Sequence, residues 1–189
     1  MNSIKHDEYF EYLTQRSRLG FIYRKYWLYP RLLKYINGKC LDVGCGIGDF
    51  VSFRKNTVGV DVNPHLVELC EQKKLNVQHM EPDKLPFPDK SFDSVILDNV
   101  LEHIENPEPL LDEINRVLVS KSVFVVGVPG TKGYDQDDDH KVFYSSEKLI
   151  KTLGLRGFKV SKAFGMPLDL NFLSARLSQY CIYGVFTKL

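Results

Sequence analysis

The amino-acid sequence predicts a mixed α/β fold in which a mostly parallel sheet carries helices on both faces. Strand-like and helix-like patterns alternate five times between residues 39 and 128, and such an alternation calls for right-handed crossovers. The segment 122–128 is apolar and β-branched, as expected of a strand that is buried on both faces. Three glycines at alternate positions, 44 to 48, follow an apolar run, which indicates a strand that turns sharply into a helix.

The composition is that of a globular protein, and we expect one domain over residues 1–189. Hydrophobic residues make up 43% of the 189 residues, which is enough for a sizeable core. A net charge of +1 argues against a nucleic-acid partner, which usually requires a strongly basic surface. The 4 cysteines are scattered, so neither a zinc site nor a disulfide framework is predicted, and reduced thiols favour a cytoplasmic location. We expect neither a signal peptide nor a membrane span.

The individual elements follow from local patterns taken in chain order. Residues 1–37 predict a helical cap, divided near Gly20 and Pro30, over a core formed by residues 38–189. The cap is rich in aromatic and cationic side chains, so it covers one edge of the sheet, closes as a lid over a ligand cleft, or does both. The expected strands are 39–43, 57–61, 77–80, 93–97, 122–128, one that begins at 158, and 180–187; the expected helices are a short one after 48, then 64–74, one after 107, one from about 145 to 157, and one around 169–178.

The glycine turn carries the strongest functional signal. The stretch Leu41–Gly48 places Asp42 two positions before Gly44, whereas the dinucleotide fingerprint needs a glycine where this chain has Asp49. This spacing resembles motif I of the class I S-adenosylmethionine (SAM)-dependent methyltransferases, and the resemblance runs from about residue 38 to about residue 160. It implies a Rossmann-like sheet of seven strands in the order 3-2-1-4-5-7-6, with the last strand antiparallel, and it implies SAM as the cofactor.

The resemblance and the strand ends together predict a cofactor site. In open α/β sheets, ligands bind at the carboxyl ends of the strands where the strand order reverses, here between the first and fourth strands. We expect Asp61 to accept hydrogen bonds from the ribose hydroxyls, and Asp42 to brace the glycine turn or face the methionine ammonium. Glu81 falls where the family binds the adenine amino group, and Pro82 has no N–H to donate to the ring. The predicted cofactor-binding residues are Asp42, Gly44, Cys45, Gly46, Gly48, Asp61, Val62, Glu81, Pro82, Asp98 and Asn99.

Two histidines are the candidate catalytic residues. His103 lies in the region that lines the methyl-donor end of the cleft in the family, and His140 resembles the start of its H-x-x-x-F/Y-S/T-x-E segment. An unperturbed imidazole titrates near neutrality, so either histidine can act as a general base or simply position its neighbours. Glu102 and His103 also resemble the E-x-x-E-H pattern of some metal-dependent methyltransferases. Asn99 replaces the first glutamate of that pattern, so no metal site is expected.

These residues predict a SAM-dependent methyltransferase that acts on a small-molecule or sugar-like acceptor. The cationic side chains of the cap favour an anionic acceptor, and the two candidate bases favour oxygen as the acceptor atom. N- or C-methylation and a catalytically silent SAM-binding regulatory subunit are the alternatives, while Asp49 disfavours a nicotinamide-dependent oxidoreductase. The acidic run 135–139 is expected to be a solvated loop.

Overall fold

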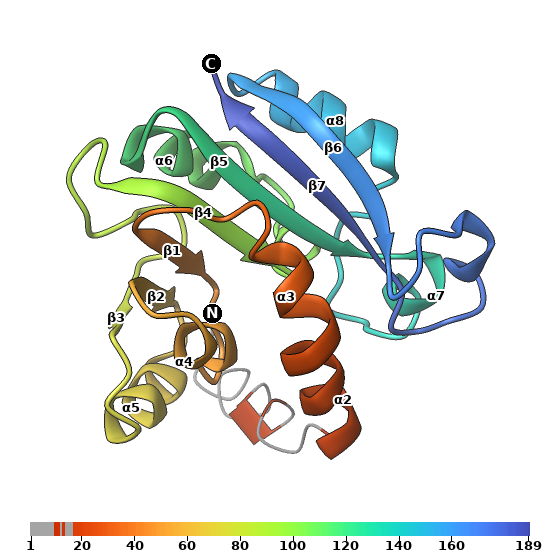
Figure 1. The fold of residues 1–189 in the computed structure, drawn as a ribbon, viewed down its shortest axis with the longest axis horizontal. Helices are drawn as coiled ribbons and strands as arrows, with labels where there is room; N and C mark the ends of the chain where they lie inside the picture. Colours follow the sequence, from red (N-terminus) through yellow and green to blue (C-terminus); the bar gives the residue numbers. More distant parts are fainter. Residues whose placement is uncertain (1–9, 12, 14–16) are drawn as a thin grey trace.

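The computed structural model describes residues 10, 11, 13 and 17–189 and shows one seven-stranded sheet (Figure 1). The strand order is β3-β2-β1-β4-β5-β7-β6, which confirms the predicted order. Strand β7 runs antiparallel to both β5 and β6, and the other neighbouring strands pair in parallel. The strands are β1 (Cys40–Val43), β2 (Thr57–Asp61), β3 (Val77–His79), β4 (Phe92–Asp98), β5 (Leu118–Pro129), β6 (Phe158–Met166) and β7 (Cys181–Lys188).

The helices begin where the sequence places capping residues. The Asn63 side chain accepts a hydrogen bond from the His65 N–H at 3.0 Å, and Ser145 accepts one from the Lys148 N–H at 3.2 Å. Pro30 is the second residue of the helix 29–32, which continues without a break from a π-helical turn at 24–28. The helical elements are α2 (Arg18–Tyr23), the π-helix η1 (Arg24–Leu28), α3 (Tyr29–Leu32), α4 (Asp49–Phe53), α5 (Pro64–Gln72), the 3-10 helix η2 (Leu101–His103), α6 (Glu108–Val117), α7 (Thr131–Tyr134), α8 (Ser146–Gly154) and the 3-10 helix η3 (Asn171–Leu173).

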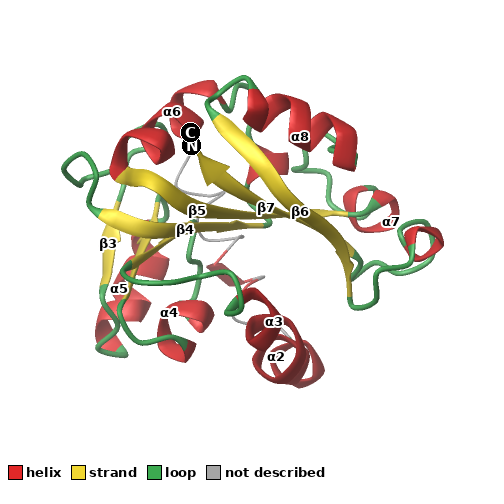
Figure 2. Cartoon of the chain, turned by 45° about the horizontal axis from the view of Figure 1, so that its top comes forward, coloured by secondary structure: helices red, strands yellow, loops and turns green. Residues whose placement is uncertain are grey.

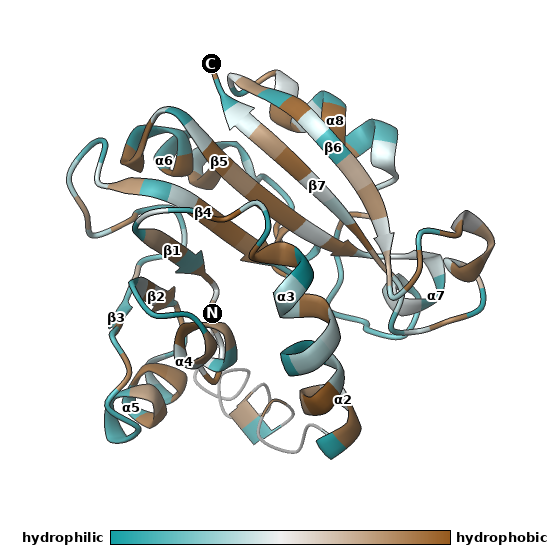
Figure 3. Cartoon of the chain, in the orientation of Figure 1, coloured by the Kyte–Doolittle hydropathy of each residue, from teal (hydrophilic) through white to brown (hydrophobic). Residues whose placement is uncertain are grey.

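Helices cover both faces of the sheet, as predicted. Helices α6 and α8 lie on one face, and α4, α5 and the N-terminal helices lie on the other (Figure 2). Apolar residues run along β5 and β7 between these layers (Figure 3). Leu111 and Ile114 of α6 are fully buried in the first layer, each burial contributing roughly 1.5–3 kcal/mol. The packing on both faces fixes the strand ends at which the candidate site lies.

The N-terminal helices belong to the second layer. Leu28 and Leu32 are buried in the same apolar cluster as Ile96 of β4 and Val125 of β5. The rest of the predicted cap, at residues 1–9, 12 and 14–16, lies outside the described residues. In the described part of the chain, no helix is both long and apolar enough to cross a membrane.

Two expectations about local structure were wrong. Gly20 does not divide the cap, because it lies inside α2 and the helical backbone continues from residue 18 to residue 32. The helix expected at 169–178 is only the short η3 between turns. There, Asp169 accepts a hydrogen bond from the Gly165 N–H of β6 at 2.7 Å, a local side-chain bond that competes with helix formation. Helix α7, directly after β5, was not predicted.

Candidate functional site

The candidate site is a cleft of about 950 Å³ near the carboxyl ends of β4 and β5, walled by α2 and η1. This volume is within the range of small-molecule sites. A smaller recess of about 40 Å³ lies beside it, at the glycine turn after β1. The two cavities share the lining residues Leu13, Arg24, Ile47, Asp49 and Asn99. The site therefore lies between β1 and β4, where the strand order reverses, as predicted.

The glycine turn leaves its backbone uncovered toward the recess. Gly44, Gly46 and Gly48 all have positive φ, at 71°, 55° and 79°. A Cβ atom at Gly44 would lie 2.5 Å from Val100 Cγ2, and one at Gly46 would lie 3.2 Å from Leu13 Cδ1. Glycine adopts this backbone conformation at little cost, whereas other residues are strained there. The predicted strand–turn–helix is thus present, and both its backbone conformation and the neighbouring side chains require glycine there.

Asp61 braces this turn. Its Oδ2 accepts the Gly46 N–H at 2.8 Å, and its Oδ1 accepts the Asn63 N–H at 2.9 Å. Bracing was expected of Asp42, so the structure reassigns that role to the carboxylate at the end of β2. Each carboxylate oxygen has two acceptor positions, so a ribose contact by Asp61 is compatible with these bonds and stays a prediction.

Asp98, at the end of β4, is held by donors from three parts of the chain. The Tyr183 hydroxyl of β7 donates to Oδ1 at 2.7 Å, and Asn99 Nδ2 donates to the same oxygen at 3.1 Å. The Arg24 guanidinium of η1 forms an ion pair with Oδ2 at 3.2 Å. Arg24 therefore ties the N-terminal helices to the sheet edge, and it is not available as the free cation that the sequence suggested for an acceptor.

Asp42 lines the recess together with Asp98 and is buried. Burial raises the pKa of its carboxyl well above the ordinary value, and the nearby charges of Asp98 and Asp61 raise it further. A cationic ligand group in the recess would relieve this repulsion and favour the ionised form. The recess is therefore suited to an ammonium or sulfonium group.

The predicted contacts to an adenine ring lie away from the described cavities. Glu81 and Pro82 are exposed in a turn that is closed by a bridge between Glu81 and Lys84. Val62 and Gly48 do not line either cavity, and the roles of these four residues as cofactor contacts stay predictions. The predicted residues that do line the recess are Asp42, Gly44, Cys45, Gly46, Asp98 and Asn99.

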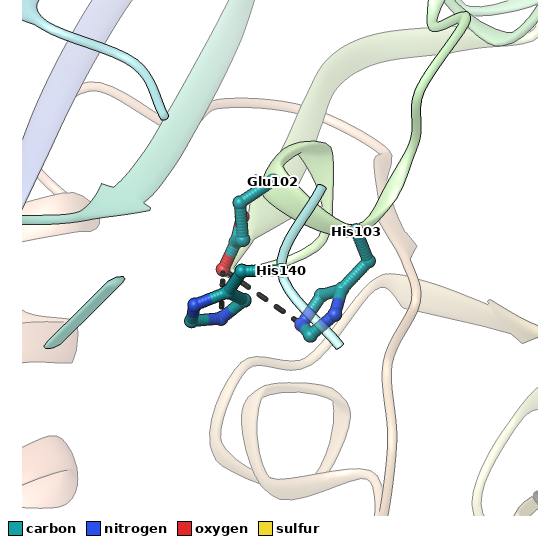
Figure 4. Close-up of side chains that lie close together, drawn as sticks. All are labelled: Glu102, His103 and His140. Carbon is teal, nitrogen blue, oxygen red and sulfur yellow. Dashed lines mark ion pairs between the residues drawn. The ribbon is translucent and has the colours of Figure 1, made fainter. Parts of the chain in front are cut away.

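Glu102, His103 and His140 converge on the far part of the cleft and are called here the Glu-His-His cluster (Figure 4). Glu102 Oε1 lies 4.0 Å from His103 Nε2 and 3.9 Å from His140 Nε2. The two imidazole centroids are 4.7 Å apart. Glu102 is only 1% exposed, and neither of its carboxylate oxygens makes a hydrogen bond within the described structure.

Backbone hydrogen bonds hold His140 beside this carboxylate. The N–H groups of Lys141 and Val142 both donate to the Glu102 carbonyl, at 2.7 and 3.0 Å. His140 Nδ1 lies 2.8 Å from the Tyr134 carbonyl. A carbonyl oxygen only accepts, so Nδ1 carries a proton, and in the neutral ring Nε2 has its lone pair free toward Glu102.

The protonation states of the cluster differ from those of exposed residues. Burial raises the pKa of Glu102 to about 8, and burial together with His140 lowers the pKa of His103. Two acids of the loop predicted to be solvated lie at its rim: Asp137 Oδ2 is 3.8 Å from His140 Nε2, and Asp139 Oδ2 is 3.8 Å from His103 Nδ1. These two acids act in the opposite direction and raise the pKa of His103, but the effects of burial and His140 are larger, so the neutral form of His103 is favoured.

Comparisons with known proteins place this geometry in a family. Residues 41–126 match the family described as "Methyltransferase domain". The chain is 29% identical over 137 residues to an uncharacterized protein of Methanocaldococcus jannaschii, with 67% of each chain covered. It is 27% identical over 171 residues to a probable S-adenosylmethionine-dependent methyltransferase of Mycolicibacterium smegmatis, with 80% of this chain and 66% of that protein covered. The matches thus span about two thirds of the length of these relatives.

The fold agrees with the same family. A SAM-dependent methyltransferase from Archaeoglobus fulgidus superposes with a TM-score of 0.70 at 22% identity, over 91% of this chain and 100% of that chain. Residues 41–126 match a methyltransferase domain, and the fold of the chain is that of class I SAM-dependent methyltransferases. The resemblance inferred from the glycine turn is confirmed, and SAM is the cofactor of this family.

Sequence reasoning missed the roles of three residues in the candidate site. Glu102 was considered only as part of a metal motif, although an acidic residue beside a histidine at a strand end was a signal in its own right. Tyr183 and Arg24 hold Asp98 across long sequence separations, and no local pattern identifies such partners. His103 and His140 were both predicted, but their convergence on one carboxylate was not.

Proposed function

We propose that this protein transfers a methyl group from SAM to a hydroxyl oxygen of a small, sugar-like acceptor. The observation that supports this proposal is that the Glu-His-His cluster and the glycine turn line two neighbouring cavities that share lining residues. A hydroxyl nucleophile must lose its proton as it attacks, and imidazole nitrogens with free lone pairs are suited to accept it.

The cofactor end fits the chemistry of SAM. The methyl donor, when bound, supplies an electrophilic methyl group on a positively charged sulfonium centre. Asp42 and Asp98 would face its cationic groups, the bare backbone of the glycine turn would contact its methionine part, and Asp61 would accept from the ribose. Ile47 and Leu13, which line both cavities, would help to exclude water from the reacting centre.

At the acceptor end, His140 is the stronger candidate for proton removal. Its side chain is only 8% exposed, and the Tyr134 carbonyl fixes the tautomer that leaves Nε2 as an acceptor. His103, with a 22% exposed side chain, faces the same carboxylate from η2. Because SAM carries a reactive methyl group, holding the acceptor oxygen in line with it would supply most of the rate.

The lining of the cleft supports a polar acceptor of moderate size. Gln136, Asp137, Ser178 and Gln179 offer hydrogen-bonding groups suited to several hydroxyls. Arg18 lines the same cleft, so an anionic group on the acceptor would meet this cation rather than the paired Arg24. The 4 free cysteines support a reducing, cytoplasmic setting for the reaction.

The test is methyl transfer from SAM labelled with a trideuterated methyl group to panels of sugars, phenols, amines and carbon acids. The proposal predicts a labelled methyl ether from at least one hydroxyl acceptor, identified by mass spectrometry and NMR. Transfer only to nitrogen or carbon would replace the proposal with its N- or C-methyl alternative. SAM binding without transfer to any panel would favour the silent SAM-binding subunit.

A further inference from the structure

The strongest unexplained feature of the molecule is the carboxylate of Glu102. It is almost completely buried, and neither oxygen has a hydrogen-bond partner within the described structure. An unpaired buried acceptor is costly, and it is normally explained by a ligand, an ion or ordered water. The nearest imidazole nitrogens, at 3.9 and 4.0 Å, are too distant to be hydrogen-bond partners.

The distances between the Glu102 carboxylate and the two imidazoles are suited to binding a metal cation. One ligand atom from each of Glu102, His103 and His140 lies within 4.8 Å of the other two. Two bonds from a common ion, each of about 2.1 Å, span up to about 4.2 Å, so small side-chain rotations would bring all three atoms to one centre. Figure 4 shows both rings directed at the same carboxylate oxygen.

The surroundings of the two histidines are also those of metal ligands. His140 has its Nδ1–H directed at the Tyr134 carbonyl, which turns the Nε2 lone pair toward Glu102. Asp139 Oδ2 lies 3.8 Å from His103 Nδ1, which is too far for a hydrogen bond but places a carboxylate on the side of the ring away from Nε2. Metal-bound histidines usually have such a carbonyl or carboxylate on their second nitrogen, because it orients the ring.

We propose that Glu102, His103 and His140 bind a divalent transition-metal cation, with Glu102 Oε1 and one nitrogen of each histidine as ligands. Two imidazoles and one carboxylate favour zinc, cobalt or manganese over magnesium or calcium, which prefer sets made of oxygen alone. Three protein ligands leave at least one coordination position open, as in catalytic zinc sites. All three residues line the cleft, so that position is accessible from it.

A cation bound at this site would change how the acceptor loses its proton. This part of the inference rests on the proposed function. An oxygen bound to a divalent cation has a lowered pKa, so the acceptor hydroxyl would ionise without a free imidazole. The two histidines would then act as ligands, and Asp137, 3.8 Å from His140, would be the adjacent group able to take up the released proton. Asn99 stands where the metal-binding pattern has its first glutamate, and this difference argued against a metal. His140, from a loop distant in sequence, supplies the third ligand instead.

The test is a titration of chelator-treated full-length protein with Co²⁺, followed by visible absorption, with Zn²⁺ as the competitor. The proposal predicts saturable binding of one Co²⁺ per chain, displaced by Zn²⁺, and a loss of affinity of about 10-fold or more in both Glu102→Gln and His140→Ala. His65→Ala is the matched control, because His65 is exposed on α5, and it should bind Co²⁺ like the wild type.

SAM binding is measured by calorimetry on the same samples and shows that each variant is folded. If SAM binds but Co²⁺ does not, or if all variants bind Co²⁺ equally, the metal proposal is wrong and the proposed function is untouched. An equal loss of Co²⁺ binding in His65→Ala would also overturn it. Co²⁺ binding without SAM binding would support the metal site and contradict the proposed function.

Discussion

At the glycine turn the structure exposes backbone atoms and two carboxylates, Asp42 and Asp98, to the recess, whereas at the Glu-His-His cluster it gathers one carboxylate and two imidazoles. At the turn, Asp61 uses both carboxylate oxygens to hold neighbouring N–H groups, so the geometry is complete before any ligand binds. At the cluster, neither oxygen of Glu102 makes such a bond with any of the described residues. The first region therefore has its geometry fixed by hydrogen bonds, and the second leaves a carboxylate available to a ligand or cation.

This difference predicts that the two regions can be damaged separately. Substitutions at the turn should remove cofactor binding and with it every later step. Substitutions in the cluster should leave cofactor binding intact and act on transfer alone.

The largest effect is expected for Gly46→Val, which should abolish measurable SAM binding. A branched side chain at a φ of 55° is strained by ~1–3 kcal/mol, and its Cβ would lie 3.2 Å from Leu13 Cδ1 and occupy the recess. Calorimetric titration with SAM measures the loss. Gly154→Ala is the matched control, because a Cβ there meets nothing within 4 Å and SAM affinity should not change. Wild-type affinity in Gly46→Val would contradict the proposed placement of the cofactor.

The second largest effect is expected for His140→Ala in methyl transfer. Loss of a group that removes the acceptor proton, directly or through a bound cation, should lower the rate by ~10²–10⁴-fold. SAM affinity should stay within about 3-fold of the wild type, because His140 does not line the recess at the glycine turn. Single-turnover rates and calorimetry on one preparation measure the two quantities. A parallel loss of both would mean that the two regions are not separable.

An intermediate effect is expected for Asp61→Ala. The Gly46 and Asn63 N–H groups would lose their acceptor, which costs ~1–3 kcal/mol and loosens the turn. We expect SAM affinity and the free energy of unfolding to fall together, as measured by calorimetry and by chemical denaturation. A loss of affinity with unchanged stability would instead point to a contact with the ligand alone.

The smallest effect is expected for Pro82→Ala. Pro82 is exposed and lies outside both described cavities, so SAM affinity should change by less than about 2-fold. A clear loss of affinity would show that the rigid turn after β3 shapes the adenine end of the site. A clear gain would show that the new N–H donates to the ring.

The same two regions show what could be predicted from the sequence. The glycine turn and the strand that leads to it are contiguous from Cys40 to Gly48, so one stretch of sequence was enough to predict the strand–turn–helix. The strand order was implied by the family resemblance, whereas the alternation of elements predicted only a mostly parallel sheet. The Glu-His-His cluster is different, because its residues come from two separate parts of the chain. The N–H groups of Lys141 and Val142 donate to the Glu102 carbonyl and so hold His140 beside Glu102. No local sequence pattern predicts these hydrogen bonds.

The role of Arg24 could not be predicted for a related reason. Its position in the cationic cap suggested a charge that attracts an anionic acceptor, but the ion pair with Asp98 depends on how η1 packs along the sheet. Tyr183 reaches the same carboxylate from the antiparallel strand β7. Such partners become visible only after the last strand has been inserted between β5 and β6.

Calorimetric titration of the wild-type protein with S-adenosylhomocysteine, with NAD⁺ as the comparison ligand, tests the cofactor assignment most directly. We predict saturable binding of one S-adenosylhomocysteine per chain and no heat of binding for NAD⁺. Binding of NAD⁺ in place of S-adenosylhomocysteine, or of neither ligand, would contradict the assignment of the glycine turn to the methyl donor.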